Sequence, residues 1–135
     1  MADWNKQIID EFRANDGQVG GNFAGAPVLL LHSTGAKSGE PRVHPMMYLA
    51  VGSDWAVFAS AAGADTHPAW FHNLLAHPDA QIEVGTDTVD VHARVTSGDT
   101  RTRIWEEQKR RYPGFAGYEQ KTSREIPVVI LERAS

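Results

Sequence analysis

The feature that most constrains the fold is a succession of short apolar runs separated by turns too short to hold a helix. Residues 28–32 are an apolar run typical of a buried strand, and residues 42–51 and 55–60 are two further strand-like segments. The connections between them are the glycine-containing turns 34–39 and 52–54. Parallel strands need crossover connections of a dozen or more residues. The three strands are therefore expected to form an antiparallel meander, which argues against a Rossmann fold.

The rest of the chain adds helices and further strands to this meander. Apolar side chains at helical spacing predict helices over residues 3–15, from a cap at Asp65 or Thr66 to Pro78, and over residues 99–111. The middle helix is expected to have Pro68 in its first turn and an apolar side made of Trp70, Phe71, Leu74 and Leu75. Strands are predicted at 81–84, 88–95 and 127–132. A small antiparallel barrel with helices packed outside fits this order of elements.

Composition removes several classes of function. The absence of cysteine excludes disulfides, thiolate metal sites and thiol nucleophiles, and it fits a cytoplasmic location. The six histidines lack the spacings of common metal motifs, so no metal site is expected. A formal net charge of -4 argues against general nucleic-acid binding. No apolar run approaches the ~20 residues that an integral membrane segment needs.

The predicted helix at residues 3–15 carries mixed charges rather than the basic face of a membrane-surface helix. We therefore expect it to dock on the core of its own domain, with peripheral membrane contact as the alternative. Glycine and asparagine residues follow it and break the chain. The predicted organisation is an N-terminal helix and linker over residues 1–18, followed by a barrel domain over residues 19–135.

The segment between the first two strands has the composition of an anion-binding turn. Gly35 and Gly39 allow the backbone to curl so that successive amide groups point at one anion. Lys37 and Arg42 add positive charge, and arginine can hold an oxyanion through two hydrogen bonds. The frame is not that of a P-loop. An ordinary hairpin turn with incidental charge explains these residues equally well on their own.

Two other groups of residues suggest a site for a flat ligand. Trp70 and Asn73 are three residues apart on a predicted helix, so an aromatic ring and an amide share one face. Residues 112–118 place three aromatics at steps of three in a glycine-containing segment, which predicts a mobile, aromatic-lined lid. The alternatives are that Trp70 is a core residue with Asn73 on the surface, and that the aromatics pack a helix end on the barrel.

Taken in order, these segments resemble the deazaflavin-dependent nitroreductase family, small oxidoreductases that use reduced coenzyme F420. The similarity covers about residues 19–132, and the motifs are specific as an ordered set. They are Gly20-Gly21, Thr34-Gly35-x-Lys37-Ser38-Gly39-x-x-Arg42-x-x-Pro45, Ala59-Ser60, Pro68-x-Trp70-x-x-Asn73-Leu74-x-Ala76-x-Pro78, Tyr112-Pro113 and Arg124-Glu125-Ile126-Pro127-Val128. The resemblance implies an α+β fold, a split β-barrel of about six mostly antiparallel strands with three flanking helices.

The resemblance also implies roles for individual residues. Lys37, Ser38 and Arg42 would hold the phosphate and oligoglutamate tail of the coenzyme. The whole implied cofactor-binding set is Thr34, Gly35, Ala36, Lys37, Ser38, Arg42, Pro45, Ala59, Ser60, Ala61, Trp70 and Asn73. The implied hydrogen-bond donors to the substrate, and hence the candidate catalytic residues, are Ser60, Tyr112 and Tyr118.

The implied chemistry is hydride transfer between the reduced deazaflavin and a small organic acceptor such as a quinone, an activated enone or a nitroaromatic. Three positions depart from the family pattern. Ala36 and Ala61 stand where relatives carry cations, and Phe115 replaces a tyrosine of some relatives. The loss of that tyrosine hydroxyl weakens the case for reduction of bicyclic nitroimidazoles.

Two other functions are compatible with the same residues. An FMN-dependent split-barrel oxidoreductase would use Lys37 and Arg42 to bind the FMN phosphate. A non-catalytic carrier would bind a coenzyme or a lipid-like ligand without turnover. The expected oligomeric state is a monomer or a homodimer.

Overall fold

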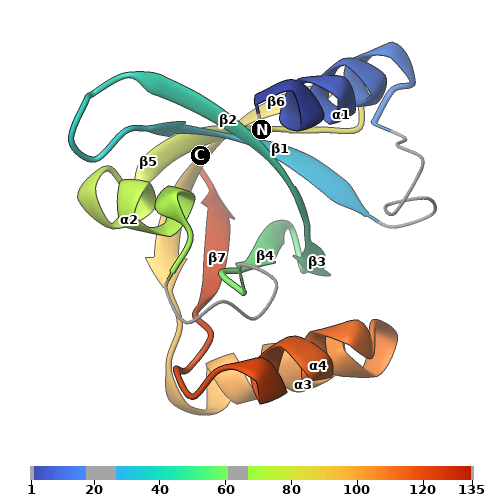
Figure 1. Cartoon of the computed structure of the whole chain (residues 1–135), viewed down its shortest axis with the longest axis vertical. Helices are drawn as coiled ribbons and strands as arrows, with labels where there is room; N and C mark the ends of the chain where they lie inside the picture. Colours follow the sequence, from blue (N-terminus) through green and yellow to red (C-terminus); the bar gives the residue numbers. More distant parts are fainter. Residues whose placement is uncertain (1, 18–26, 61–66, 135) are drawn as a thin grey trace.

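The computed structural model describes residues 2–17, 27–60 and 67–134, and it confirms the predicted α+β split barrel (Figure 1). The strands are β1 (Val28–Thr34), β2 (Pro41–Met47), β3 (Leu49–Val51), β4 (Asp54–Phe58), β5 (Asp79–Val84), β6 (Asp87–Val95) and β7 (Val128–Arg133). The helices are α1 (Ala2–Ala14), α2 (Ala69–Ala76), α3 (Gly98–Arg111) and α4 (Gly114–Lys121). All strands belong to one sheet, with antiparallel neighbours in the order β2-β1-β5-β6-β7-β4-β3.

The two edges of this sheet are consecutive in the chain. The single strand predicted over residues 42–51 is divided at Tyr48 into β2, which pairs with β1, and β3, which pairs with β4. The Tyr48 amide donates to the carbonyl of Pro27 at 3.2 Å, which is the last bond in the register of the β1–β2 ladder, and the next residue, Leu49, pairs with β4 instead. Because β2 and β3 lie at opposite ends of the strand order, the sheet has to curl into a barrel to join them.

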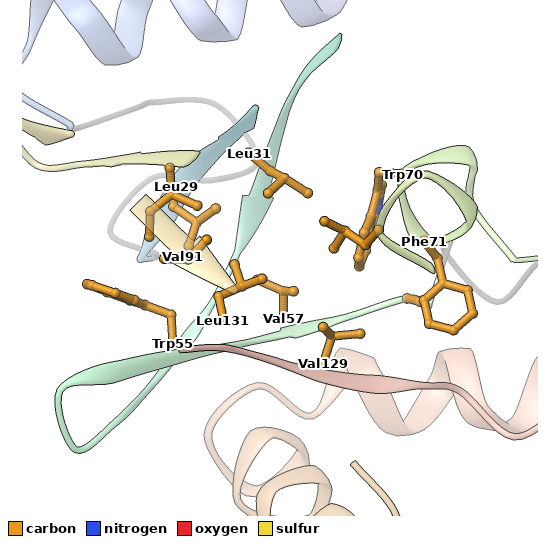
Figure 2. Packing of buried hydrophobic residues seen from close by; sticks show 12 residues of the cluster. Leu29, Leu31, Trp55, Val57, Trp70, Phe71, Val91, Val129 and Leu131 are labelled. Atoms are coloured by element: carbon orange, nitrogen blue, oxygen red, sulfur yellow. The ribbon is translucent and has the colours of Figure 1, made fainter. Parts of the chain in front are cut away.

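Alternating side chains of the curled sheet build the core on its inner face. Leu29, Leu31, Val57 and Leu131 point into the barrel, where α2 contributes Trp70, Phe71 and Leu74. Figure 2 shows the Trp70 and Phe71 rings reaching from α2 toward the strands. A fully buried leucine or phenylalanine side chain contributes roughly 1.5–3 kcal/mol by leaving water. This cluster therefore fixes α2 against the open side of the barrel.

The outer face of the sheet is covered at two places. Phe12 of α1 is buried against Val28 and Leu30 of β1, so the N-terminal helix docks on the barrel as the sequence favours. At the other end of the molecule, Ile104 and Trp105 of α3 cover β4 and β7, and α4 packs beside α3 (Figure 1). Within the described residues, no helix is long and apolar enough to cross a membrane.

Three local predictions need correction. Pro68 is the N-cap of α2 rather than part of its first turn, and Leu75 is 56% exposed. Asn73, which is 7% exposed, is buried in place of Leu75. The reason is that the side of the helix that contains Trp70 also contains Phe71, Asn73 and Leu74. Residues 114–121 form the helix α4, where Phe115 packs against the core of α3, so the structure shows the alternative of packed aromatics at a helix end instead of a lid. Asp65, Thr66, Gly20-Gly21 and the predicted domain boundary at 18/19 lie outside the described residues.

Candidate functional site

A cleft of about 580 Å³ lies between the turn that joins β1 to β2 and the helix α2. Its lining residues are Gly35, Ala36, Lys37, Ser38, Arg42, His44, Ala69, His72 and Asn73. Most of them are predicted from the sequence as ligand-binding residues, but His44, Ala69 and His72 are not. The turn and α2 are far apart in the chain, and the fold brings them together because α2 packs on the inner face of β1.

The turn itself is closed by its own backbone. The Gly35 amide donates to the Glu40 carbonyl at 2.8 Å, and the Gly39 amide donates to the Gly35 carbonyl at 3.0 Å. Gly39 has a φ of 70°, a conformation that favours glycine. A Cβ atom on Gly35 would collide with the Ser38 hydroxyl, which accepts a hydrogen bond from the Glu40 amide at 3.2 Å. The turn is therefore formed in advance of any ligand, and the two glycines are needed for its shape.

Asn73 ties this turn to α2. Its Oδ1 accepts a hydrogen bond from the Ala36 amide at 3.0 Å, and its Nδ2 donates to the Ser33 hydroxyl at 3.4 Å. Ser33 is also buried. Asn73 is expected from the sequence to face a ligand ring, whereas in the structure its amide group positions the turn.

The cleft has a cationic rim. Lys37 is exposed, and the side chain of Arg42 is 50% exposed. The Arg42 guanidinium lies 3.6 Å from the carboxylate of Glu40, which is itself exposed, so the pair is weak and screened by water. Both cations are thus available to an anionic ligand, for which they would provide charge-assisted hydrogen bonds.

His44 forms part of the cleft wall on β2. It pairs with Leu31 of β1, whose side chain lies in the inner core. Burial, followed by the positive charge of Arg42, lowers the pKa of His44 below its ordinary value of 6.5. The imidazole is therefore neutral at neutral pH. The signal for it was present in the sequence, because residues 42 and 44 of a strand share one face.

The predicted catalytic residues lie outside the set that lines the cleft. Ser60 is buried just after β4, and its carbonyl accepts a hydrogen bond from Arg124 at 2.9 Å. Tyr112 is the C-cap of α3 and lies near Tyr48, where burial and then Tyr112 raise the pKa of Tyr48. Tyr118 lies on α4 with its ring centroid 5.2 Å from that of Phe115. None of the three lines the cleft, but Arg124 contacts both the Ser60 carbonyl and His67, whose ring lies 5.9 Å from that of the cleft residue His72.

The remaining predicted residues have varied positions. Trp70 and Ala59 are buried in the inner core, and Figure 2 shows the Trp70 ring among its neighbours. Thr34 lines a different, shallower surface near β5 and β6. Pro45 pairs with Leu30, so it lies on the face of β2 toward α1. Ala61 lies outside the described residues.

Known proteins resemble this chain in both sequence and fold. A sequence model of the family described as F420H(2)-dependent quinone reductase matches residues 4–133. An F420H(2)-dependent quinone reductase of Mycobacterium tuberculosis is 38% identical over 129 residues, which cover 90% of this chain and 85% of the relative. A solved F420-H2 dependent reductase has a TM-score of 0.72 at 37% identity, covering 78% of this chain and 94% of its own. Another solved structure, described as a domain-swapped dimer, has a TM-score of 0.74 at 34% identity and covers 97% of this chain and 98% of its own.

Proposed function

This chain belongs to the F420H(2)-dependent quinone reductase family, and on that premise we propose that the cleft between the β1–β2 turn and α2 binds the anionic tail of coenzyme F420. The protein is an oxidoreductase that transfers a hydride between the reduced deazaflavin and a small organic acceptor. The observation that carries the assignment of the cleft is its composition. The cleft joins a preformed turn, two available cations and the imidazole of His44 in its wall.

These residues fit the coenzyme tail on chemical grounds. The phosphate and oligoglutamate groups of the tail are anionic and rich in hydrogen-bond acceptors. Lys37 supplies a mobile point charge, and Arg42 supplies a planar guanidinium that can grip an oxyanion through two hydrogen bonds. The turn needs no rearrangement to present them, so little conformational entropy is lost when the ligand binds.

The coenzyme, when bound, supplies a carbon centre that passes a hydride rather than single electrons. The protein has to orient the acceptor, exclude water and polarise the group that gains negative charge. We assign the polarising role to the hydroxyls of Ser60, Tyr112 and Tyr118. Ser60 is buried, and the two tyrosines are half-buried, so their hydrogen bonds would be little weakened by water.

We propose quinones as the main class of acceptor, because the family and the relative are named for quinone reduction. Activated enones and nitroaromatics are further candidates, because the chain resembles the deazaflavin-dependent nitroreductases. Phe115 bears on the last class. Its ring centroid lies 5.7 Å from that of Phe58 and 6.1 Å from that of Trp105, so it is a packing residue of the α3–α4 core. It offers no hydroxyl to a nitro group, which supports quinones over bicyclic nitroimidazoles as acceptors.

The decisive experiment is a fluorescence titration of the purified protein with F420 and, separately, with FMN. We expect saturable F420 binding, followed by oxidation of the bound reduced coenzyme when a quinone is added. Tight FMN binding with no response to F420 would refute the proposal in favour of the FMN-dependent enzyme. Binding of F420 without oxidation by a panel of quinones, enones and nitroaromatics would identify a carrier.

The place of binding is tested by removing the two cations of the cleft. Replacing both Lys37 and Arg42 with alanine is expected to weaken F420 binding by at least tenfold, because a hydrogen bond to a charged group is worth about 1.5–3 kcal/mol. The matched control is the double replacement of Arg103 and Lys121, two exposed cations of α3 and α4. It changes the net charge equally and should leave the affinity near that of the wild type. Equal losses in both variants would mean that the effect is general electrostatics.

The oligomeric prediction, a monomer or a homodimer, is open to a direct measurement. The 34% identical relative described as a domain-swapped dimer supports the homodimer. Light scattering during size-exclusion chromatography distinguishes a mass of 14.8 kDa from twice that value.

A further inference from the structure

Arg124 is a half-buried residue of the segment between α4 and β7. This segment is fixed in the fold, because Ile126 is buried in the cluster that α3 forms with β4 and β7. The Pro127 carbonyl also accepts a hydrogen bond from the Ala59 amide at 3.0 Å, and the Arg124 amide donates to the Thr122 hydroxyl at 3.3 Å. The Arg124 side chain therefore extends from a backbone whose position is set by other contacts.

Two contacts of the Arg124 guanidinium join different elements of the fold. Its Nη2 donates to the Ser60 carbonyl at 2.9 Å, and its Nη1 lies 2.9 Å from Nδ1 of His67. Ser60 follows β4 and His67 precedes α2. The ring centroid of His67 lies 5.9 Å from that of His72, which lines the cleft. One guanidinium thus connects the end of β4 with the start of α2.

The chemistry of the guanidinium determines where His67 carries its proton. Arginine stays charged and can only donate hydrogen bonds. The Nδ1 atom of His67 is therefore the acceptor, and the proton of the neutral ring is on Nε2. The pKa of His67 agrees with this assignment, because burial, then Arg124 and then His72 hold it below its ordinary value of 6.5.

Ser60 is held through its backbone and not through its side chain. The residue is 8% exposed, and its carbonyl is the atom that Arg124 binds. Within the part of the chain that the structure describes, the Ser60 hydroxyl makes no hydrogen bond and is not one of the fully buried atoms without a partner. It is therefore left for a ligand. Because the carbonyl and the side chain share one Cα atom, a fixed carbonyl restricts where the hydroxyl can lie.

We propose that Arg124 is a positioning residue for hydride transfer, which orients the Ser60 hydroxyl toward the acceptor by bridging the Ser60 carbonyl and His67. This inference rests on the proposed role of Ser60 as a donor to the acceptor. Loss of the bridge should slow the transfer and leave the tail contacts at Lys37 and Arg42 unchanged. The planar fork of arginine is needed, because the single ammonium group of a lysine cannot hold both partners in the same geometry.

The first test compares Arg124→Gln and Arg124→Lys with the wild type. Each should slow hydride transfer from bound F420 to a quinone by about tenfold or more, because a small misplacement of a positioning group raises the barrier. The affinity for F420 should stay within about threefold. The matched control is Arg101→Gln, because Arg101 donates two hydrogen bonds to the Ile126 carbonyl, at 3.2 and 2.7 Å, in the same part of the molecule. This control should lose stability but keep its rate within about threefold.

A double-mutant cycle with Ser60→Ala distinguishes positioning from general damage. If Arg124 acts through Ser60, Arg124→Gln should slow the Ser60→Ala protein by less than about twofold. A second readout needs no coenzyme: long-range proton–nitrogen NMR correlations of the ligand-free wild type at neutral pH should show the Nε2–H tautomer of His67. If Arg124→Gln fails to fold, His67→Ala removes one end of the bridge, and its effect on the rate should likewise disappear in the Ser60→Ala background.

Several results would overturn the role of Arg124 alone. They are a wild-type rate in Arg124→Gln or Arg124→Lys, full additivity with Ser60→Ala, and a proton on Nδ1 of His67 in the wild type. Failure of the wild-type protein to bind F420 or to reduce a quinone would instead overturn the proposed function and this inference together.

Discussion

Asn73 offers the sharpest test of how the fold prepares the anion-binding turn. Asn73→Ala removes the 3.0 Å hydrogen bond from the Ala36 amide and the 3.4 Å bond to the Ser33 hydroxyl. Ala36 is exposed, so water can replace its partner, whereas the Ser33 hydroxyl is left buried without one. One lost hydrogen bond of about 0.5–1.5 kcal/mol and a buried unpaired hydroxyl together predict a loss of about 1–3 kcal/mol in the free energy of unfolding.

The effect on ligand binding follows from the same contact. Among the described residues, no other hydrogen bond replaces this link between residues 35–38 and α2 when the Asn73 side chain is removed. Ordering the backbone of one residue costs about 1–2 kcal/mol, and that cost moves from folding to binding. Because 1.4 kcal/mol corresponds to tenfold, the affinity for F420 should fall by roughly 5- to 30-fold, although Lys37 and Arg42 are unchanged.

The assay is a fluorescence titration with F420, performed well below the melting temperature of each variant. Ser33→Ala is the matched control, because it removes the weaker partner of Asn73 and leaves the bond to Ala36 in place. We expect this control to lose some stability and to bind within about twofold of the wild type. A folded Asn73→Ala protein with wild-type affinity would refute the idea that α2 positions the turn. Equal weakening by Ser33→Ala would point to general damage between α2 and β1.

Three further predictions concern other parts of the molecule. Ser60→Ala should slow quinone reduction by the loaded enzyme more than it weakens F420 binding. If pre-steady-state measurements instead show a normal rate of hydride transfer with weaker F420 binding, Ser60 is a coenzyme-binding residue. A hydrogen bond from Arg13 holds the pKa of Glu83 below its ordinary value of 4.5. The pair therefore stabilises the fold above that pH, and this stabilisation is lost as the pH falls through the lowered pKa. In urea unfolding, the free energy of unfolding of Glu83→Gln should decrease less on acidification than that of the wild type. Gln108 is fully buried, and neither of its side-chain amide atoms has a partner among the described residues, so Gln108→Met should raise the free energy of unfolding by about 1–3 kcal/mol. A lower melting temperature would contradict this reasoning.

The parts of the site that sequence alone predicts are those made by one short segment. The turn closes through its own backbone, and Lys37 and Arg42 follow Gly35 within seven residues. The shape and the charge of the turn are therefore determined by residues that are close together in the sequence. Strand alternation already places His44 beside Arg42, whereas the burial of its imidazole is known only from the structure. His72 of α2 had no such signal at all.

The wrong predictions arise where long-range packing decides between two local choices. For residues 112–118 the sequence leaves open a lid and a packed helix end, and the packing of Phe115 against Phe58 and Trp105 favours the helix. The α2 surface shows the same effect. Asn73 is the more polar residue, but its hydrogen bonds to the turn satisfy its amide, so it is buried and Leu75 is left in water.

The position of the predicted tyrosine donors relative to the cleft has a mechanistic consequence. The inner face of β2 runs from Arg42 through His44 and Met46 to Tyr48, and Tyr48 lies beside Tyr112. At about 3.3 Å per residue, this path is roughly 20 Å long. A coenzyme with its tail at Arg42 can reach the tyrosines only if it lies extended along the strand. Contacts with the tail are then the same before and during hydride transfer, so changes at the cleft should alter affinity, whereas changes at the far end should alter the rate.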